Sequence, residues 1–352
     1  MKKALKIIGC VLLAVVILAG GFIGYLTLTE FNPAATENAS VTNGQNDTLH
    51  VGASLRIMTF NTGYAGLDSS QDFFMDGGSK VNPEGGTEQV KSNMAAILET
   101  IQSENAQIVL LQEVDEDSAR SGHINQVAYY QSNTAMTSAF AINYQCSFVP
   151  YPIPPIGKVQ SGIMTLSAYQ PTEATRESLP CPFSWPIRVA NLKRCLLVER
   201  FPVADSDKEL VVVNLHLEAF DDGEGKAAQT KQLYSFLKSE YDKGNYVIAG
   251  GDFNQTFSTA ASIGGSWEGK WTPANLDEDS IPEGISLAVD PTLPTCRSLD
   301  QVYTGDRENH AFYIIDGFLV SDNVQVDEIH TLDLDFAASD HNPVVMQVTL
   351  GE

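Results

Sequence analysis

Eight short apolar runs, spread between residues 55 and 350, place the strictest constraint on how this chain can fold. Each run is bounded by polar or glycine-containing turns, a pattern typical of β-strands. The runs are residues 55–61, 107–114, 160–169, 195–201, 210–217, 246–253, 311–320 and 343–350. Several of them, such as LVVVNLHL at 210–217, are almost continuously apolar, so we expect both of their faces to be buried.

Two amphipathic helices are predicted between these strands, at residues 87–106 and 226–244. Each carries apolar residues on one helical face, which is the face expected to cover a sheet. These residues are Met94, Ile97, Leu98 and Ile101 in the first helix and Leu233, Phe236 and Leu237 in the second. The pattern predicts an α/β fold in which two packed sheets are covered by outer helices.

The N-terminus carries a separate signal. Lys2, Lys3 and Lys6 precede an uncharged stretch, Ile7–Leu28, whose 22 residues would rise roughly 33 Å as a helix, enough to cross a bilayer. A cleaved signal peptide is the alternative, but its apolar region is usually shorter. We therefore expect residues 1–28 to form an uncleaved transmembrane anchor. The lysines place its N-terminus in the cytoplasm and the rest of the chain on the extracytoplasmic side of the cell membrane.

Past the anchor, composition divides the chain into a tether and one large domain. Residues 29–54 are rich in Asn, Thr, Ala and Ser and show no apolar period, so they are predicted to be a flexible tether. Residues 55–352 show no internal repeat or second change of composition, which predicts a single catalytic domain. Within it, residues 256–298 lack periodicity and are expected to form loops over one end of the sheets.

The chain is strongly acidic, with 44 Asp and Glu residues against 21 Lys and Arg and a formal net charge of −23. Such a surface repels nucleic acid and anionic lipid at long range, although salt screens the repulsion and a local basic cleft can override it. The charge therefore disfavours a nucleic-acid substrate without excluding one.

Four cysteines lie outside the anchor, and they are Cys146, Cys181, Cys195 and Cys296. An exported domain permits disulfides, and four cysteines allow three complete pairings between which the sequence does not choose. No CxxC pair or Cys/His cluster indicates a zinc site.

Polar residues able to bind a metal or move a proton recur where the apolar runs end. They are Asn61, Glu113, His216, Asp252, Asn254, Asp316, Asp340 and His341. Any one of them alone is readily explained as a turn or cap residue. Glu113 is harder to explain in this way, because its neighbours are apolar and burying an unpaired carboxylate is costly. Their number predicts one common site at one edge of the packed sheets.

The order of these motifs resembles that of the endonuclease/exonuclease/phosphatase superfamily, which includes pancreatic deoxyribonuclease I, exonuclease III, neutral sphingomyelinases and inositol polyphosphate phosphatases. The resemblance covers about residues 55–352, and its motifs are FN, QEV, SGIMTLS, NLHL, GDFN, IDGFLVS and SDHNPV. Each string is short, but their number, order and spacing together are specific. The resemblance implies a four-layer α/β/β/α sandwich of two packed mixed sheets flanked by helices.

The resemblance also implies a metal site and a pair of residues beside it. Glu113 resembles the main metal-ligand acid, and Asn61 and Asp340 resemble the residues that complete the site. Hard oxygen donors of this kind suit Mg²⁺, with Mn²⁺ or Ca²⁺ as alternatives. Asp252 and Asn254 resemble the pair that positions the nucleophile and one phosphoryl oxygen.

Two histidines are expected to handle protons. Asp316 resembles the acid that orients His341, in the manner of the third member of a catalytic triad. Water that attacks phosphorus must lose a proton, and the resemblance leaves the general base open between His341 and Asp252. His216 resembles the family's second histidine, which could protonate the departing alkoxide.

Substrate-binding residues are expected beside this site. Arg194 resembles an arginine that contacts phosphate in the deoxyribonuclease I branch. Two further stretches match no general motif of the family and lie next to the expected cleft, where loops usually set substrate choice. They contribute Arg120, His123 and Asn125 from the first stretch and Arg297, Tyr303, Arg307 and His310 from the second.

The sequence thus predicts a membrane-tethered, extracytoplasmic, Mg²⁺-dependent phosphoesterase acting on a phosphate mono- or diester. Lipid or small-molecule esters are favoured as substrates, and a tethered nuclease similar to deoxyribonuclease I is the alternative. Two further alternatives are a non-catalytic scaffold that keeps the fold and a metal-independent hydrolase, although the chain lacks a nucleophile motif such as GxSxG. No protein partner is implied.

Overall fold

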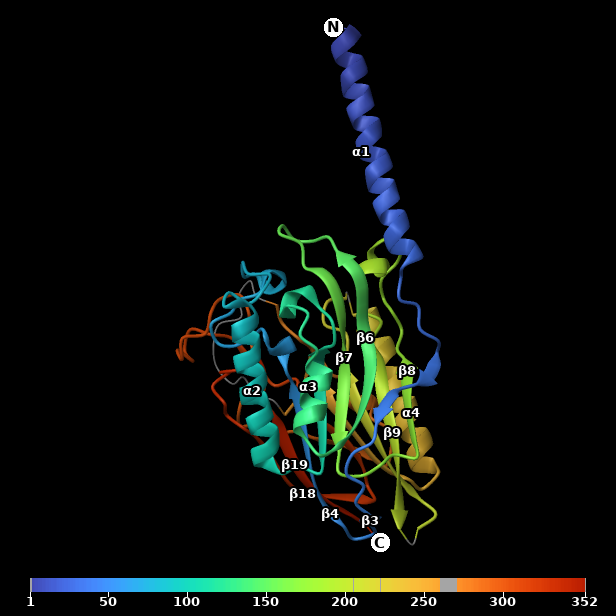
Figure 1. The fold of residues 1–352 in the computed structure, drawn as a ribbon. Coiled ribbons are helices and arrows are strands. Elements are labelled where there is room, and N and C mark those ends of the chain that lie inside the picture. Colours follow the sequence, from blue (N-terminus) through green and yellow to red (C-terminus); the bar gives the residue numbers. More distant parts are fainter. Residues whose placement is uncertain (1, 205, 222, 260–270, 352) are drawn as a thin grey trace.

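The structure is a computed structural model that describes residues 2–204, 206–221, 223–259 and 271–351. These residues form two packed β-sheets with helices on both outer faces, and a long N-terminal helix projects away from them (Figure 1). The predicted α/β fold of two mixed sheets flanked by helices is confirmed.

One sheet has eight strands. They are β1 (Thr36–Asn38), β3 (Leu49–His50), β8 (Glu173–Ser178), β9 (Cys195–Ala204), β10 (Glu209–His216), β11 (Tyr246–Asp252), β14 (Ile285–Ala288) and β17 (Asp316–Ser321). Their order is β1-β8-β9-β10-β11-β17-β14, and β3 pairs with β9 beside this path. The pair β10/β11 is parallel, and β17 runs antiparallel to β11.

The second sheet has seven strands. They are β2 (Ser40–Thr42), β4 (Ser54–Asn61), β5 (Ile108–Asp115), β6 (Thr137–Val149), β7 (Gly157–Ser167), β18 (Val324–Thr331) and β19 (Val344–Leu350). Their order is β18-β19-β4-β5-β7-β6-β2, with β4/β5 parallel and β19 antiparallel to β4. Two small ribbons complete the described β-structure, β12 (Gln255–Thr256) with β13 (Ala274–Asn275) and β15 (Cys296–Arg297) with β16 (Phe312–Tyr313).

Four α-helices accompany the sheets in the described residues. They are α1 (Lys2–Leu28), α2 (Gly86–Glu104), α3 (Gln126–Asn133) and α4 (Glu224–Asp242). The predicted apolar face of α2 packs on the outer face of the seven-stranded sheet, and that of α4 packs on the outer face of the eight-stranded sheet. Between the sheets, buried side chains such as Ile57, Leu110, Val212, Ile248 and Phe318 form a third apolar layer. Each fully buried side chain of this kind stabilises the fold by roughly 1.5–3 kcal/mol.

Most predicted elements are present, and the differences have local causes. The run at 311–320 is divided between β16 and β17 rather than forming one strand. The strands β6, β8 and β18 and the helix α3 were not predicted, because polar residues interrupt their apolar ones, and in β6 several of these polar residues are buried. Residues 256–298 are not all loops, since β14 pairs with β17 at the sheet edge, and residues 260–270 lie outside the described part.

The prediction of a flexible tether at residues 29–54 is wrong. In this segment β1 pairs with β8, β2 pairs with β6 and β3 pairs with β9, so it contacts both sheets. Its polar composition is explained by its position, because β1 and β2 lie at sheet edges and their side chains are mostly exposed. The chain beyond α1 is therefore folded from its first residues onward, and the division into an anchor and a catalytic domain stays a prediction.

The cysteines of the described residues form no disulfide. All five cysteines of the chain fall in this part, and none is joined to another. Cys146, Cys195 and Cys296 are buried. The fold is therefore stabilised by its core rather than by covalent links between these residues.

Glu199 places a carboxylate between the two sheets. It lies in the middle of β9, it is fully buried, and neither of its oxygens has a hydrogen-bond partner at normal distance among the described residues. Burial raises the pKa of Glu199 to about 7, and the nearby Thr165 hydroxyl lowers it only in part. The core therefore holds a group that resists ionisation at neutral pH.

We expect Glu199→Gln to raise the Tm at pH 8, by an amount equivalent to roughly 3 kcal/mol, because the folded state no longer contains a carboxylate that must ionise in the core. The folded pKa of about 7 exceeds the ordinary value of 4.5, so the native state loses stability as the pH rises through this window. Most of the gain should therefore vanish at pH 5. Thermal unfolding of the chain in detergent measures this, with the exposed Glu328→Gln as a control. An equal gain at both pH values would contradict the raised pKa.

Candidate active site

Side chains from both sheets meet at one edge of the sandwich. Asn61 ends β4, His216 ends β10 and Asp252 ends β11, while Glu113 lies near the end of β5. β4/β5 and β10/β11 are parallel pairs, so the carboxyl ends within each pair lie side by side, and the hydrogen bond from Asn61 to Asp252 shows that the two pairs end at the same edge. The predicted gathering of strand-end residues is therefore present in the structure.

Three of the predicted residues reach this edge in a different way. Asp316 begins β17 and stands opposite Asp252 in the pairing of β17 with β11. Asp340 and His341 come just before β19, which is antiparallel to β4. The sequence suggested strand ends for all of them, but antiparallel strands bring their starts to the edge where their neighbours end.

The backbone is strained where two of these side chains are presented. Glu113 has a positive φ of 53° within a bulge, where the register of β5 against β7 shifts between Leu111 and Val114. Asn254 has a φ of 50°, and its backbone N–H donates to Oδ1 of Asp252 over 2.8 Å. Bulges re-aim side chains next to active sites, and a left-handed non-glycine residue costs on the order of 1 kcal/mol. The fold therefore holds both residues in orientations that a regular strand would not give.

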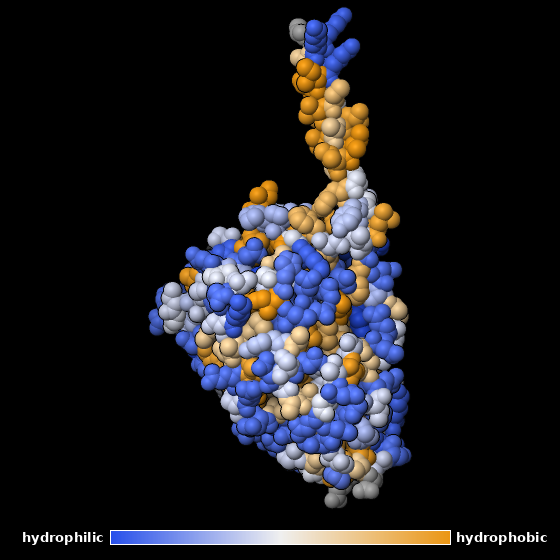
Figure 2. Space-filling model, in the orientation of Figure 1, coloured by the Kyte–Doolittle hydropathy of each residue, from blue (hydrophilic) through white to orange (hydrophobic). Residues whose placement is uncertain are grey.

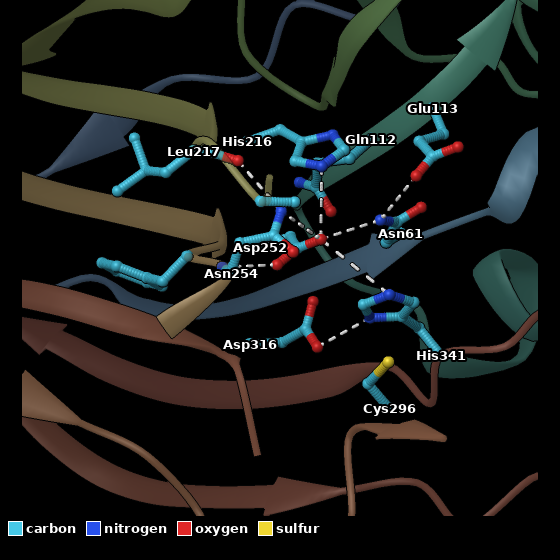
Figure 3. Close-up of polar contacts among 12 residues, drawn as sticks. Asn61, Gln112, Glu113, His216, Leu217, Asp252, Asn254, Cys296, Asp316 and His341 are labelled. Carbon is cyan, nitrogen blue, oxygen red and sulfur yellow. Dashed lines mark hydrogen bonds and ion pairs between the residues drawn. The ribbon is translucent and has the colours of Figure 1, made fainter. Parts of the chain in front are cut away.

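Asp252 is the centre of the polar cluster (Figure 3). Its Oδ2 accepts a hydrogen bond from Nδ2 of Asn61 over 3.0 Å. The same oxygen lies 3.4 Å from Nε2 of His216 and 3.9 Å from Nε2 of His341. Both histidines thus face one carboxylate.

Asp316 orients the ring of His341. Its Oδ2 lies 2.8 Å from Nδ1 of His341, and both side chains are almost completely buried. Burial opposes a charged imidazole, but the Asp316 carboxylate outweighs it and raises the pKa of His341 well above its ordinary value. Oδ1 of Asp316 has no hydrogen-bond partner among the described residues. His341 is therefore expected to be protonated at neutral pH, with Nε2 directed toward Asp252.

The other two titratable groups of the cluster are shifted differently. Burial, helped by the positive charge of Arg194, lowers the pKa of His216 well below its ordinary value. Burial and then the neighbouring Asp316 carboxylate raise the pKa of Asp252 to about 7. At neutral pH the site thus combines a neutral His216, a charged His341 and an Asp252 able to gain or lose a proton.

A second group of carboxylates lies beside this cluster. Glu113 and Asp340 are close enough that the charge of Glu113, after burial, contributes to raising the pKa of Asp340 to about 6. Asp76, from the 3₁₀ turn Phe74–Asp76, joins them, and burial with the charges of Asp340 and Glu113 raises its pKa to about 7. Carboxylates that repel one another are stabilised by a hard divalent cation, which prefers oxygen ligands.

Two features of the structure bear on this metal site. Gly63 has a φ of +50°, and a Cβ there would lie 2.7 Å from Oδ1 of Asp340, so the close approach of this carboxylate requires glycine. The amide nitrogen of Asn61, rather than its oxygen, faces Glu113 at 3.3 Å, while Oδ1 accepts from the N–H of Gly63. Asn61 therefore connects Glu113 to Asp252 in this structure, and its predicted role as a ligand stays a prediction.

Cys296 also lies close to His341 and Asp340, but its chemistry is different. Burial raises the pKa of the Cys296 thiol to about 12, so it stays protonated at neutral pH. The thiolate is the form that binds metals and attacks substrates. Cys296 is therefore a poor candidate for either role.

The polar cluster forms part of the lining of a cavity of about 360 Å³. Much of the remaining wall is apolar, and it includes Phe73, Met75, Tyr144, Ile156, Phe220 and Trp271. Asp76, Phe73 and Met75 come from a loop in which the sequence analysis found no candidate. The only signal was the pair of aromatic residues and the methionine at 73–75 in an otherwise polar segment.

Three of the predicted substrate-binding residues line this cavity, but the side chain of each is already paired with other groups of the protein. Arg120 pairs with Asp115 over 2.9 Å and stacks on Tyr64. Arg194 lies 3.4 Å from Glu218 and donates to the carbonyl of His216. The remaining one, Arg297, donates to the carbonyls of Leu67, Asp68, Gln71 and Ser298.

The other predicted recognition residues are not among those that line the cavity. His123 is exposed and contacts Asp117, and Asn125 caps α3 by accepting from the N–H of Ala128. Further along the chain, Arg307 pairs with Asp333, while Tyr303 and His310 pack together with Phe312 and Phe336. Each of these two stretches therefore reaches the cavity through one arginine, Arg120 or Arg297, while the other predicted residues make contacts within the fold.

Comparison with known proteins identifies a family. A sequence model described as the endonuclease/exonuclease/phosphatase family matches residues 58–341. A search among curated protein sequences found no match.

Solved structures with the same fold were also found. The endonuclease/exonuclease/phosphatase from Beutenbergia cavernae is 20% identical, with a TM-score of 0.61, over 85% of this chain and 72% of that one. The corresponding protein from Bacteroides vulgatus is 15% identical, with a TM-score of 0.53, over 85% and 99%. D. rerio TDP2 complexed with single strand DNA product is 14% identical, with a TM-score of 0.51, over 84% and 99%. At these identities the likeness supports the fold alone.

We expect Asp316→Asn to lower the pKa of His341, because the neutral amide removes the charge that favours the imidazolium. NMR titration of the His341 ring in the wild type and the variant measures this directly and does not depend on activity. His330 contacts Glu328 rather than the site, so its signal should be unaffected by the substitution. Identical His341 titrations in the two proteins would show that Asp316 does not control this ring.

Proposed function

The chain belongs to the endonuclease/exonuclease/phosphatase family, and we propose that it is a metal-dependent phosphoesterase acting at the outer surface of the membrane. Members of this family are hydrolases of phosphoester bonds. One observation carries the proposal for this chain: Asp252 faces a His341–Asp316 pair and a second histidine in the lining of a cavity. This arrangement offers both a base and an acid to a reacting phosphate.

We assign the general base to Asp252. Its pKa of about 7 lets the carboxylate accept a proton from an attacking water near neutral pH. His341 carries a proton on Nε2 that it can donate to a phosphoryl oxygen or to the departing alkoxide. His216, in contrast, is neutral, so in this proposal it donates a hydrogen bond rather than supplying the proton that the sequence analysis expected of it.

Glu113 and Asp340 are the residues that would hold Mg²⁺, with Asp76 as an additional acid and Asn61 orienting Glu113. When bound, the ion would offset charge on the phosphoryl oxygens. Mn²⁺ and Ca²⁺ remain alternatives for the same oxygen donors.

The shape and polarity of the cavity favour a substrate with an apolar part next to its phosphate. Apolar side chains such as Phe73, Met75 and Phe220 form much of its wall. The arginines that line it are bound by protein groups, and the chain as a whole is strongly acidic. Both features disfavour a polyanionic substrate. Nucleic acid is the second candidate, because the D. rerio neighbour holds a single strand DNA product.

The location is proposed from α1. It is the one helix of the described residues that is long and apolar enough to cross a membrane, although a signal sequence meets the same criteria. We propose that it is an uncleaved anchor that holds residues 29–352 on the extracytoplasmic side, because its three lysines precede the apolar stretch.

The full-length chain in detergent should hydrolyse a phosphoester in the presence of Mg²⁺ and lose this activity in a chelator. The test panel contains sphingomyelin, phosphatidylglycerol phosphate, inositol phosphates, plasmid DNA and RNA. We expect Glu113→Gln to reduce turnover at least about 100-fold, the scale of losing one electrostatic group in an active site. Glu328→Gln, on the exposed surface, serves as the control. Activity that survives chelation would overturn the metal proposal, and no turnover of any substrate would favour a scaffold.

The pH dependence should reveal the base. If ionised Asp252 accepts the proton, kcat/KM should rise as the pH increases through about 7 and fall again when His341 loses its proton at higher pH. Asp252→Asn and His341→Ala should each lower kcat at least about 100-fold without unfolding the chain, as judged by circular dichroism. If Asp252→Asn kept the rising limb of the profile, another group would be the base.

A further inference from the structure

Large apolar side chains are exposed around the foot of α1. Figure 2 shows hydrophobic atoms on the surface of the domain where the helix leaves it. We call this group the apolar collar, and its members are Phe148, Tyr151, Ile153, Trp185 and Ile187. Among the described residues after Leu28, four of them are the most exposed large apolar side chains, at 55–95%. Isolated surface residues of this kind are ordinary, but a group of them on one face marks an interaction site.

Direct contacts tie the collar to the helix. The rings of Phe22 and Phe148 lie 5.9 Å apart, and Nε1 of Trp185 donates to the Thr27 hydroxyl over 3.1 Å. Next to Ile187, Arg188 pairs with Glu30 just past the helix end. The hairpin between β6 and β7, which carries Tyr151 and Ile153, lies at the same end of the domain as α1 (Figure 1). The collar therefore has a fixed position along the axis of α1.

This position along the axis places the collar in the membrane if α1 crosses it. The uncharged stretch runs to Leu28, so its end lies at the outer surface of the bilayer. Phe22 lies roughly 9 Å further along the helix axis toward the bilayer centre. Phe148 contacts Phe22, and a side chain at that depth is below the headgroups. Trp and Tyr, both present in the collar, are enriched at membrane interfaces.

We propose that the apolar collar docks into the outer leaflet of the membrane that α1 crosses, so that the domain rests on the bilayer instead of hanging from it. The occupant is a lipid surface. Apolar burial must supply the attraction, because the net charge of −23 gives none toward anionic lipid and the nearby Arg188 is already paired.

The collar also shares a wall with the catalytic cavity. Tyr144 and Ile156 line the cavity and pack in the cluster that contains Leu26 of α1. The ring of Tyr151 lies 5.5 Å from that of Phe74, whose neighbours Phe73 and Met75 also line the cavity. Docking would hold the apolar part of the cavity against the leaflet, where a lipid phosphoester of the same membrane can enter. This last consequence rests on the proposed phosphoesterase activity, whereas the docking itself rests only on the proposed membrane anchor.

Fluorescence quenching by lipids brominated on their acyl chains tests the docking. The full-length chain is reconstituted in phosphatidylcholine vesicles, with a reporter introduced as Ile153→Trp in a Trp185→Phe background. The matched control introduces Val326→Trp in the same background, because Val326 is also exposed but lies in β18. Trp185→Phe alone gives the emission to be subtracted, and thermal unfolding verifies that each variant is folded.

We expect the brominated lipids to quench the added emission of the Ile153→Trp variant at least about twofold and that of the Val326→Trp variant hardly at all, because only the former would reach the acyl chains. Equal and weak lipid quenching of both reporters, with strong quenching of both by aqueous acrylamide, would overturn the docking.

Activity measurements separate this inference from the proposed function. The double variant Tyr151→Asp and Ile153→Asp should lower hydrolysis of a vesicle-embedded phospholipid at least about fivefold while changing that of a soluble short-chain ester less than about twofold, since charge opposes insertion. Equal loss on both substrates would contradict the role of docking in access. If no substrate is hydrolysed, the proposed function fails, and the quenching experiment still decides whether the collar docks.

Discussion

Buried aliphatic side chains of β4, β5, β10 and β11 interlock between the two sheets, and the position of every candidate catalytic residue depends on this contact. Asn61 and Glu113 belong to one sheet, whereas His216 and Asp252 belong to the other. A slip of one residue in any of these strands would turn its apolar side chains outward and its functional side chain away from the site. A buried hydrogen bond of 2.8 Å from Gln112 to Asn214 joins the sheets just behind the site and opposes such a slip.

The same scaffold sets the protonation of the site. In water the two histidines would have similar pKa values, but burial makes the pKa of each depend on its surroundings. The carboxylate of Asp316 outweighs burial and raises the pKa of His341, whereas burial, helped by the charge of Arg194, lowers the pKa of His216. The scaffold also holds the backbone of Glu113 and Asn254 at positive φ angles, which residues other than glycine rarely adopt.

The N-terminal helix is attached firmly to the domain that holds the candidate site. Its last turns pack on the domain through Phe22, Leu26 and Thr27, and residues 29–54 continue along both sheets. A domain attached in this way has a fixed orientation relative to α1, unlike one on a flexible tether. The apolar wall of the cavity, through Tyr144 and Ile156, belongs to the structure that makes this attachment.

The sequence by itself determined the two packed sheets, their covering helices and the eight polar residues at the site. Apolar periodicity and strand-end motifs are patterns of neighbouring residues, so the sequence shows them directly. It could not place Asp76, which reaches the acids from a loop without a motif, or exclude His123, Asn125, Tyr303 and His310, which lie near the site in the chain but not at the cavity. It also mistook residues 29–54 for a tether, since edge strands need no apolar pattern. Only the tertiary structure decided which histidine is charged, which arginines are already bound and where the cavity is apolar. These properties are set by distance and burial between segments remote in the chain, which no local pattern records.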